Sequence, residues 1–303
     1  MTGKLTLSIL AAATLACGAA AKEIKLLTIG NSFADSAFVY LPRVAESAGA
    51  KVVMDRANIG GCPLDKHWKL VEQSEADASV KPYNKKYTLR GKLESQKWDV
   101  VTIQQYSGYS WRPETYEPYA KNLQAYVKKY APQAELVMQE TWAYRFDDGR
   151  YQQWKMNQQE MFDKLVAAYD KAAADLGVRL IRTGEAVQLA RETQPVKYVP
   201  YDTEALKKLK HPAELPSQEG SLTFGYKWDK RKNKKTGEEE WYIKNDPAHL
   251  NNRGRYLQAC LWFGFLFDKP TSEIKFVPEE LTAEDAAFLR ATAQKILDAH
   301  RKK

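Results

Sequence analysis

Three side chains of this sequence could together carry out nucleophilic chemistry. Ser32 lies in KLLTIGNSFA (25–34), directly after an apolar run, and Asp246 and His249 lie in NDPAHL (245–250). A serine hydroxyl becomes a good nucleophile only when a neighbouring base removes its proton, and a carboxylate beside that base fixes its tautomer. In a Pro-containing turn, a spacing of three residues lets Asp246 reach one side of the His249 ring and leaves Nε2 free. We therefore predict Ser32 as nucleophile, His249 as base and Asp246 as the orienting acid.

Each of the three residues also has a purely structural interpretation. A serine that follows a strand is a common helix cap, so Ser32 could serve only the helix after it. His249 could be a core or capping histidine, and Asp246 could simply start the following helix. The catalytic interpretation requires the chain to bring residues 32 and 249 together.

An acyl-transfer site also needs hydrogen-bond donors for the oxyanion of the tetrahedral intermediate. The main-chain N–H of Ser32 is one candidate donor. Gly60 and Gly61 are further candidates, because a tight glycine turn exposes N–H groups even when its first role is the turn itself. A side-chain amide from Gln104 or Gln105 could supply another donor, and Gln104 is the preferred choice.

The elements that must position these residues are visible as a regular alternation. Apolar runs rich in Val, Ile and Leu are separated by segments of helical period, which is typical of crossovers between parallel strands buried on both faces. Ligands of such open sheets bind beyond the carboxyl ends of the strands, where the candidate residues and TWAY (141–144) all lie. The class is therefore α/β. The predicted strands are 24–30, 51–57, 98–105, 134–141 and 178–184.

Helical period is clear over 119–130 and over 154–168, and Gly177 is a natural end for the second helix. A final helix should begin near Thr282, whose side chain can cap it. Residues 193–245 break the alternation with Pro-rich connectors and a predicted β-hairpin around a Lys-Asn-Lys-Lys-Thr-Gly turn. We expect this insertion to be a surface flap, with direct substrate contact as the alternative. The aromatic residues expected to hold it are Phe224, Trp228, Trp241 and Tyr242.

In order, these blocks resemble the SGNH/GDSL-type hydrolases: Gly-x-Ser after the first strand, a glycine loop after the second, an amide residue after the third, and Asp-x-x-His near the C-terminus. The resemblance covers residues 25 to about 260. It implies a single domain over 22–303, a three-layer sandwich with a central parallel sheet of about five strands. GNSF replaces the usual Gly-Asp-Ser-Leu, and IQQYSG stands where many members carry Gly-x-Asn-Asp. ANIGGCPLDKHW, WDVVTIQQYSG and GRYLQACLWF resemble, more narrowly, a branch common in Bacteroidota.

The resemblance implies an exported serine esterase that removes a short acyl group, such as acetyl, from a small-molecule or polysaccharide ester. The alternatives are a non-catalytic carbohydrate-binding protein on the same fold, a sugar acyltransferase, and a uronic-acid methylesterase. Members of the superfamily use no metal or organic cofactor, and the sequence has neither Cys-x-x-Cys nor His-x-x-x-His to suggest a metal site. Residues expected to line a substrate cleft are Asn31, Asn58, His67, Trp68, Trp142 and Tyr144, with core packing or loop ordering as the alternative for each.

Residues 1–21 are typical of a secretory signal peptide. Lys4 provides a positive start, residues 5–17 are mostly apolar, and Ala19 and Ala21 occupy the small-residue positions before a cleavage site. The apolar run is too short for a permanent transmembrane helix. We therefore predict a secreted or periplasmic protein cleaved near Ala21, with a lipoprotein modified at Cys17 as the alternative.

The remaining composition excludes several partners. The net charge is +8, but no run of Lys and Arg is interleaved with aromatic residues as in nucleic-acid grooves, so no nucleic-acid partner is predicted. No other segment resembles a transmembrane span. After cleavage, Cys62 and Cys260 remain, and they could form one disulfide or stay as two free buried thiols.

Overall fold

The computed structural model describes residues 21–301. Cys17 and the predicted signal peptide, apart from its last residue, lie outside this range. Between residues 21 and 301, no helix has both the length and the apolar character needed to cross a bilayer.

Five parallel strands form the central sheet in the order β2-β1-β3-β4-β5, as the predicted α/β class requires. Gly30 pairs with Asn58, and Ile29 pairs with Ile103, so the strand ends that precede the candidate residues lie along one edge of the sheet. The strands are β1 (Lys22–Gly30), β2 (Ala50–Asn58), β3 (Val100–Ile103), β4 (Glu135–Gln139) and β5 (Arg179–Ile181).

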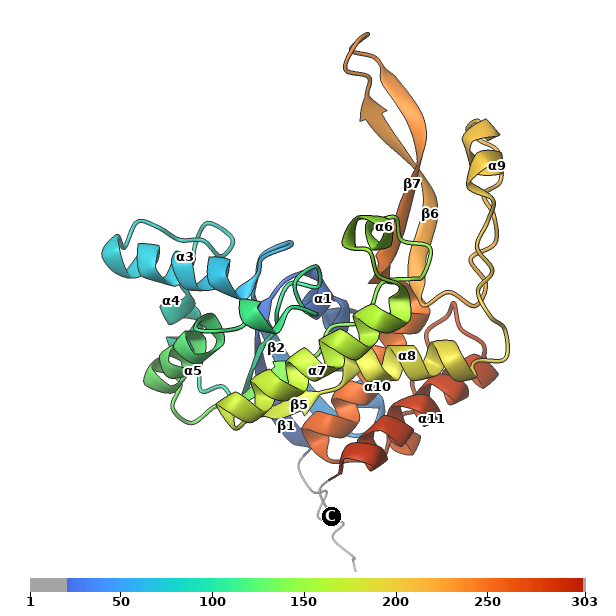
Figure 1. Ribbon diagram of the computed structural model, residues 1–303. Coiled ribbons are helices and arrows are strands. Elements are labelled where there is room, and N and C mark those ends of the chain that lie inside the picture. The colour runs from blue at the N-terminus through green and yellow to red at the C-terminus, as the bar shows by residue number, and fades with distance from the viewer. Residues whose placement is uncertain (1–20, 302–303) are drawn as a thin grey trace, which may run out of the picture.

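Helices cover both faces of this sheet (Figure 1). The helices are divided between the two faces because crossovers between parallel strands are right-handed. The chain crosses the sheet from β1 to β2 in one direction and through β3, β4 and β5 in the other. Helices α2 (Leu41–Ser47) and α10 (Asn252–Phe267) contact each other on one face, and α5 (Tyr119–Tyr130) and α7 (Gln158–Leu176) contact each other on the opposite face. The outer elements are α3 (Leu64–Ala76), α4 (Leu89–Glu94), α8 (Thr183–Thr193) and α11 (Ala283–His300).

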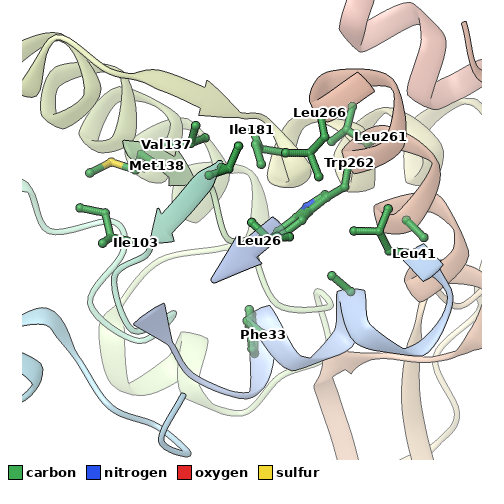
Figure 2. Packing of buried hydrophobic residues seen from close by; sticks show 14 of the residues in the cluster. Leu26, Phe33, Leu41, Ile103, Val137, Met138, Ile181, Leu261, Trp262 and Leu266 are labelled. Atoms are coloured by element: carbon green, nitrogen blue, oxygen red, sulfur yellow. The ribbon is translucent and has the colours of Figure 1, made fainter. Parts of the chain in front are cut away.

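The core on the α10 side is built around Trp262, which is fully buried. Figure 2 shows its ring among Leu26 and Ile181 of the sheet and Leu266 of its own helix. The indole N–H donates a 3.2 Å hydrogen bond to Thr183 Oγ1, so this buried polar atom is satisfied. Trp262 therefore holds α10 against this face of the sheet.

Helix boundaries follow their capping residues. Asn157 and Glu160 form a capping box at the start of α7, and Gly177 ends the helix with φ +65°. The single helix predicted over 154–168 is wrong at its start, because Lys155 adopts φ +50° and ends the short helix α6 (Arg150–Trp154). Thr282 caps α11 as predicted, since its hydroxyl accepts the N–H of Asp285 at 3.1 Å.

The predicted hairpin is present as β6 (Thr223–Lys232) and β7 (Glu239–Leu250), which project from the body beside the segment that carries α9 (Thr203–Lys208) (Figure 1). An isolated two-stranded hairpin is marginally stable in water. Here the neighbouring segment braces it, because His211 stacks on Trp241 at 3.8 Å and the Trp228 indole donates to the Ala213 carbonyl at 2.9 Å.

The end of β7 differs from the prediction. The segment with Asp246 and His249, expected as a turn beyond the hairpin, belongs to the strand itself. Thr223 pairs with Leu250, whereas Gly225, only two residues further, pairs with Asp246. Residues 247–249 therefore form a bulge, a feature that often re-aims side chains next to functional sites.

Substitution of Gly177 by Ala should lower the free energy of unfolding by about 1 kcal/mol, because a Cβ meets no neighbour there but strains a backbone at φ +65°. Chemical denaturation measures the difference. Gly149→Ala is the matched control, since that site is equally open but has φ −62°. Equal losses in the two variants would contradict the backbone explanation.

Candidate active site

Ser32 is the first residue of α1 (Ser32–Asp35), but it is not the residue that caps this helix. The Asn31 side chain does so, because its Oδ1 accepts the N–H of Phe33 at 3.0 Å. The hydroxyl of Ser32 is therefore not needed for capping. It lies 2.9 Å from Nε2 of His249, which is 217 residues later in the chain.

The three predicted side chains form one continuous chain of hydrogen bonds. Nδ1 of His249 lies 2.9 Å and 3.0 Å from the two carboxylate oxygens of Asp246. A carboxylate at Nδ1 holds the proton on that nitrogen and leaves Nε2 to accept from the serine hydroxyl. Helix α10 begins at Asn252 and is capped by Asn251, so neither Asp246 nor His249 serves it as a cap.

The electrostatics of Asp246 favour a charged carboxylate. Burial raises the pKa of Asp246, but hydrogen bonds from the ring and the main-chain N–H of His249 more than offset this effect, so its pKa lies below the usual value. The His249 side chain is 40% exposed, which leaves it accessible from solvent. An ionised acid, an oriented imidazole and a serine hydroxyl are thus aligned at the edge of the sheet.

The glycine loop after β2 lies beside the serine. The Ile59 N–H donates to the Gly30 carbonyl at 2.9 Å, and the Asn31 amide donates to the Cys62 carbonyl at 3.3 Å. The turn from Ile59 to Cys62 needs Gly61 at φ +61°, a conformation that other residues rarely adopt. Among the described residues, no protein acceptor pairs with the main-chain N–H groups of Ser32, Gly60 and Gly61.

Gln105 does not supply the predicted amide donor. Its Nε2 donates to the carbonyl and the hydroxyl of Thr115 at 2.8 and 3.0 Å, so both amide hydrogens are used. Its Oε1 accepts the N–H groups of Leu64 and Tyr106. The residue is fully buried and joins the loop after β3 to the start of α3.

Gln104 acts on Asn31 rather than facing solvent. The side chain is fully buried, and its Nε2 donates to Asn31 Oδ1 at 2.8 Å. It passes so close to Gly30 that a Cβ there would lie 2.8 Å from Gln104 Cγ. The amide therefore lies against Asn31 in the interior of the protein. Contrary to the prediction of Gln104 as an oxyanion donor, this buried amide donates to the residue before Ser32.

Trp142 and Tyr144 were expected either to line a substrate cleft or to pack in the core, and their exposed fractions of 0% and 1% favour core packing. Trp142 stacks on Phe33 at 4.1 Å, and its indole N–H donates to the Ala248 carbonyl at 2.7 Å. The Tyr144 hydroxyl lies 2.8 Å from Ser107 Oγ. These rings pack behind the site and leave no face for a substrate.

The remaining predicted cleft residues are also structural in this fold. Asn31 is buried beneath the turn, and Asn58 accepts the Thr28 hydroxyl at 3.1 Å at the end of β2. The Trp68 indole donates to Glu72 one turn along α3, and the ring packs against the core. The buried face of α3 includes Leu64, His67 and Val71, which agrees with the packing alternative.

His67 is fully buried and braces the peptide before the serine. Its Nε2 lies 3.0 Å from the Gly30 carbonyl oxygen, and its Nδ1 lies 3.0 Å from the Tyr83 hydroxyl. Burial lowers the pKa of His67 from 6.5 to about 4 and outweighs the opposing hydrogen bond to Gly30. At neutral pH the ring is therefore uncharged, donating from Nε2 and accepting at Nδ1.

Comparison with known proteins gives the family. The profile of a domain of unknown function, DUF4886, matches residues 25–199. The chain belongs to the DUF4886 family. A comparison with curated proteins found no match. A DUF4886 protein from Bacteroides uniformis is 24% identical, with a TM-score of 0.68 over 93% of this chain and 97% of the other, so the fold recurs within the family.

More distant similarities extend to proteins described as ester hydrolases. A protein from Slackia heliotrinireducens, assigned provisionally to the SGNH hydrolases, is 24% identical, with a TM-score of 0.40 over 54% of this chain and 80% of the other. An acetylxylan esterase from Geobacillus stearothermophilus is 13% identical, with a TM-score of 0.39 over 57% and 82%.

Sequence reasoning missed the buried polar groups that hold α1 in this DUF4886 chain. The Phe33 carbonyl accepts amide hydrogen bonds from Gln139 at 3.5 Å and from Gln258 at 3.2 Å, and both glutamines are fully buried. Gln258 lies within the apolar run 257–267 of α10, which is the one signal that could have drawn attention to it. A buried amide is costly unless it is paired, so such a residue indicates a specific partner.

The two cysteines are buried free thiols, which decides between the alternatives left open by the sequence. Burial raises the pKa of both Cys62 and Cys260 to about 12. Neither thiol is therefore a nucleophile at neutral pH. Between residues 21 and 301, no group of three or more His, Cys, Asp or Glu side chains could hold a metal ion.

We expect acid to destabilise this DUF4886 protein partly through His67. The unfolded chain binds a proton below pH 6.5, but the native ring does so only near pH 4, so the free energy of unfolding falls as the pH drops through that window. The loss should reach about 2–3 kcal/mol at pH 4.5. Denaturant unfolding at pH 7 and pH 4.5 measures it in wild type and in His67→Gln, which should lack this component.

The exposed His211→Gln is the control and should keep the pH dependence of the wild type. A wild-type pH dependence in His67→Gln would show that His67 does not titrate in this way.

Proposed function

We propose that this DUF4886 protein is an exported serine esterase that removes a short acyl group, acetyl in the simplest case, from a carbohydrate through an acyl-enzyme on Ser32. The observation that carries the proposal is the continuous chain from Ser32 Oγ to His249 Nε2, at 2.9 Å, and from His249 Nδ1 to Asp246. Two separate segments meet with the donor and acceptor order that serine activation requires.

The reaction proceeds in two steps. Ser32 Oγ forms a bond to the ester carbonyl carbon while His249 Nε2 takes the serine proton, and the same proton then goes to the sugar oxygen as its bond to the acyl carbon breaks. In the second step His249 removes a proton from a water molecule that attacks the acyl carbon, and it returns this proton to Ser32 Oγ as the bond from Oγ to the acyl carbon breaks and the carboxylic acid leaves. Asp246 stays ionised and stabilises the imidazolium in both steps.

The oxyanion is bound by main-chain donors in this proposal. The donors are the N–H groups of Ser32, Gly60 and Gly61. Hydrogen bonds from Asn31 to Cys62 and from Ile59 to Gly30 hold the serine segment and the glycine turn together. Gln104 contributes by orienting the Asn31 cap. The site then has no side-chain oxyanion donor, unlike the Asn-containing relatives that the sequence motifs resemble.

The predicted signal peptide, the motif resemblance and the basic composition support the substrate class. The predicted signal peptide favours a substrate outside the cytoplasm, and the resemblance to SGNH hydrolases favours a decorated polysaccharide. The basic composition also suits an acidic glycan, which keeps a methyl-esterified uronic acid as a variant of the same chemistry.

Substitution of Ser32 by Ala should reduce kcat on p-nitrophenyl acetate by about 10³-fold or more, because the attacking atom is lost. The thermal midpoint should change little, since the helix is capped by Asn31. Ser74→Ala is the control, as that hydroxyl donates only to carbonyls of its own helix. Full turnover in Ser32→Ala would reject the mechanism.

Incubation with acetylated and with methyl-esterified plant polysaccharides should release acetate and little methanol, measured by chromatography. Release of methanol alone would instead identify a uronic-acid methylesterase. Transfer of the acyl group to an added sugar acceptor would identify an acyltransferase. Retained glycan binding without any turnover would support a non-catalytic protein.

A further inference from the structure

The two residues between Asp246 and His249, Pro247 and Ala248, are held by a single neighbouring segment, residues 142–145. The Trp142 indole donates to the Ala248 carbonyl at 2.7 Å, and the main-chain N–H of Arg145 donates to the Pro247 carbonyl at 3.0 Å. The carbonyl groups of Pro247 and Ala248, the two residues between the acid and the base, therefore accept hydrogen bonds from outside the hairpin.

The hairpin itself does not supply this support. Asp246 pairs with Gly225 and Leu250 pairs with Thr223, so residues 247–249 have no ladder partner in β6. A bulge without ladder hydrogen bonds has more conformational freedom than a paired strand. The orientation of the Asp246–His249 pair thus depends on residues 142–145.

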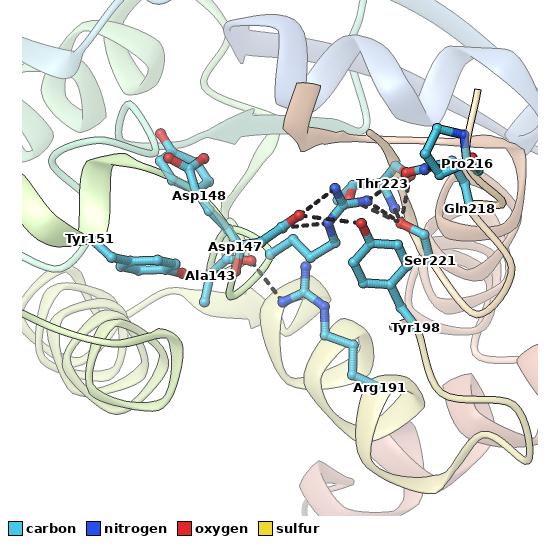
Figure 3. Close-up of polar contacts among 12 residues, drawn as sticks. Ala143, Asp147, Asp148, Tyr151, Arg191, Tyr198, Pro216, Gln218, Ser221 and Thr223 are labelled. Atoms are coloured by element: carbon cyan, nitrogen blue, oxygen red, sulfur yellow. Dashed lines mark hydrogen bonds and ion pairs between the residues drawn. The ribbon is translucent and has the colours of Figure 1, made fainter. Parts of the chain in front are cut away.

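The Arg145 side chain fixes this segment to other parts of the chain through hydrogen bonds to Asp147, Gln218 and Ser221, which are labelled in Figure 3. Nε and Nη2 donate to the two carboxylate oxygens of Asp147 at 2.6 and 2.8 Å, and Nη1 donates to Gln218 and to Ser221, each at 3.0 Å. The guanidinium also lies 3.9 Å from the centre of the Tyr198 ring. One side chain therefore joins the loop after β4 to the connector that leads into β6.

β6 passes close to this guanidinium. A Cβ at Gly225 would lie 2.7 Å from Arg145 Nη1 and 1.8 Å from Gln218 Oε1, and Gly225 is the residue paired with Asp246. The backbone of β6 can approach Arg145 only because this residue has no side chain. Arg145 thus lies next to the β6 residue that pairs with Asp246.

Direct contact of Arg145 with a substrate does not fit these observations. The residue is 3% exposed, and its charge is paired with Asp147. A guanidinium that makes four hydrogen bonds within the protein has a role in holding the structure around it.

We propose that Arg145 is a positioning residue for the Asp246–His249 pair, which it orients through residues 142–145 and the carbonyls of Pro247 and Ala248. The inference rests on the proposed function, because it assigns Arg145 to the alignment of the same acid and base. Arg145 touches neither substrate nor reacting atoms, so its loss changes the reactivity of Ser32 without changing substrate affinity.

Arg145→Lys keeps the charge but loses the planar fork that reaches Gln218 and Ser221. The test is the rate at which a fluorophosphonate probe labels Ser32, a reaction in which Oγ bonds to phosphorus, fluoride leaves and the serine proton passes to His249. We expect the labelling rate and kcat on p-nitrophenyl acetate to fall about 10- to 100-fold, with KM nearly unchanged.

Arg182→Lys is the matched control. Arg182 is partly buried and bonds to Asp170 and Glu185 at 2.7 and 2.5 Å, but it has no contact with the acid or the base. Its variant should lose comparable thermal stability and keep a labelling rate within about threefold of wild type. A loss of rate confined to Arg145→Lys separates positioning from general destabilisation.

Asp147→Asn provides a second variant if Arg145→Lys does not fold, because it keeps the shape of the partner while removing its charge. We expect it to lower the labelling rate about 3- to 10-fold. Labelling of both variants as fast as Arg182→Lys would overturn the role of Arg145 and leave the proposed function intact. Failure of the wild-type protein to be labelled at Ser32 would overturn the proposed function and, with it, this inference.

Discussion

The hydrogen bond between Ser32 and His249 connects residues 217 positions apart, and neither end of it is held by a long regular element. Ser32 starts a helix of four residues, and His249 lies in a bulge at the root of a hairpin. A contact of this kind needs rigid support behind both partners. The buried Trp142 ring supplies part of it, because it stacks on Phe33 and bonds to the carbonyl before His249.

Much of the fold could be predicted because it depends on local patterns. Apolar runs gave all five strands, helical period gave α5 and most of α7, and Gly177 and Thr282 marked helix ends correctly. The error at Trp154 came from a period that continues across a break, since Lys155 and Asn157 interrupt the backbone without interrupting the apolar face. Periodicity records which side is buried and does not record whether the chain is continuous.

The candidate site was predictable only in part, for a related reason. Ser32, Asp246 and His249 could be chosen because their chemistry requires those residue types in order along the strands. The surroundings could not, because burial decides their roles: Trp142, Tyr144 and His67 are covered by segments distant in sequence. Gln104 shows the same limit, because it is fully buried and its amide donates to Asn31.

The location of the acid and the base on β7 has an implication for recombining members of this family. The tip of the hairpin, residues 232–239, is largely exposed and lies beyond the contacts of Trp228 and Trp241 with the neighbouring segment, so it is a natural place for loop exchange. The root is different, because Arg145 bonds to Gln218 and lies close to Gly225. Gly225 in turn pairs with Asp246. A chimera that takes the hairpin from another parent should therefore keep its crossover points above this root, or transfer 218–249 together with residue 145.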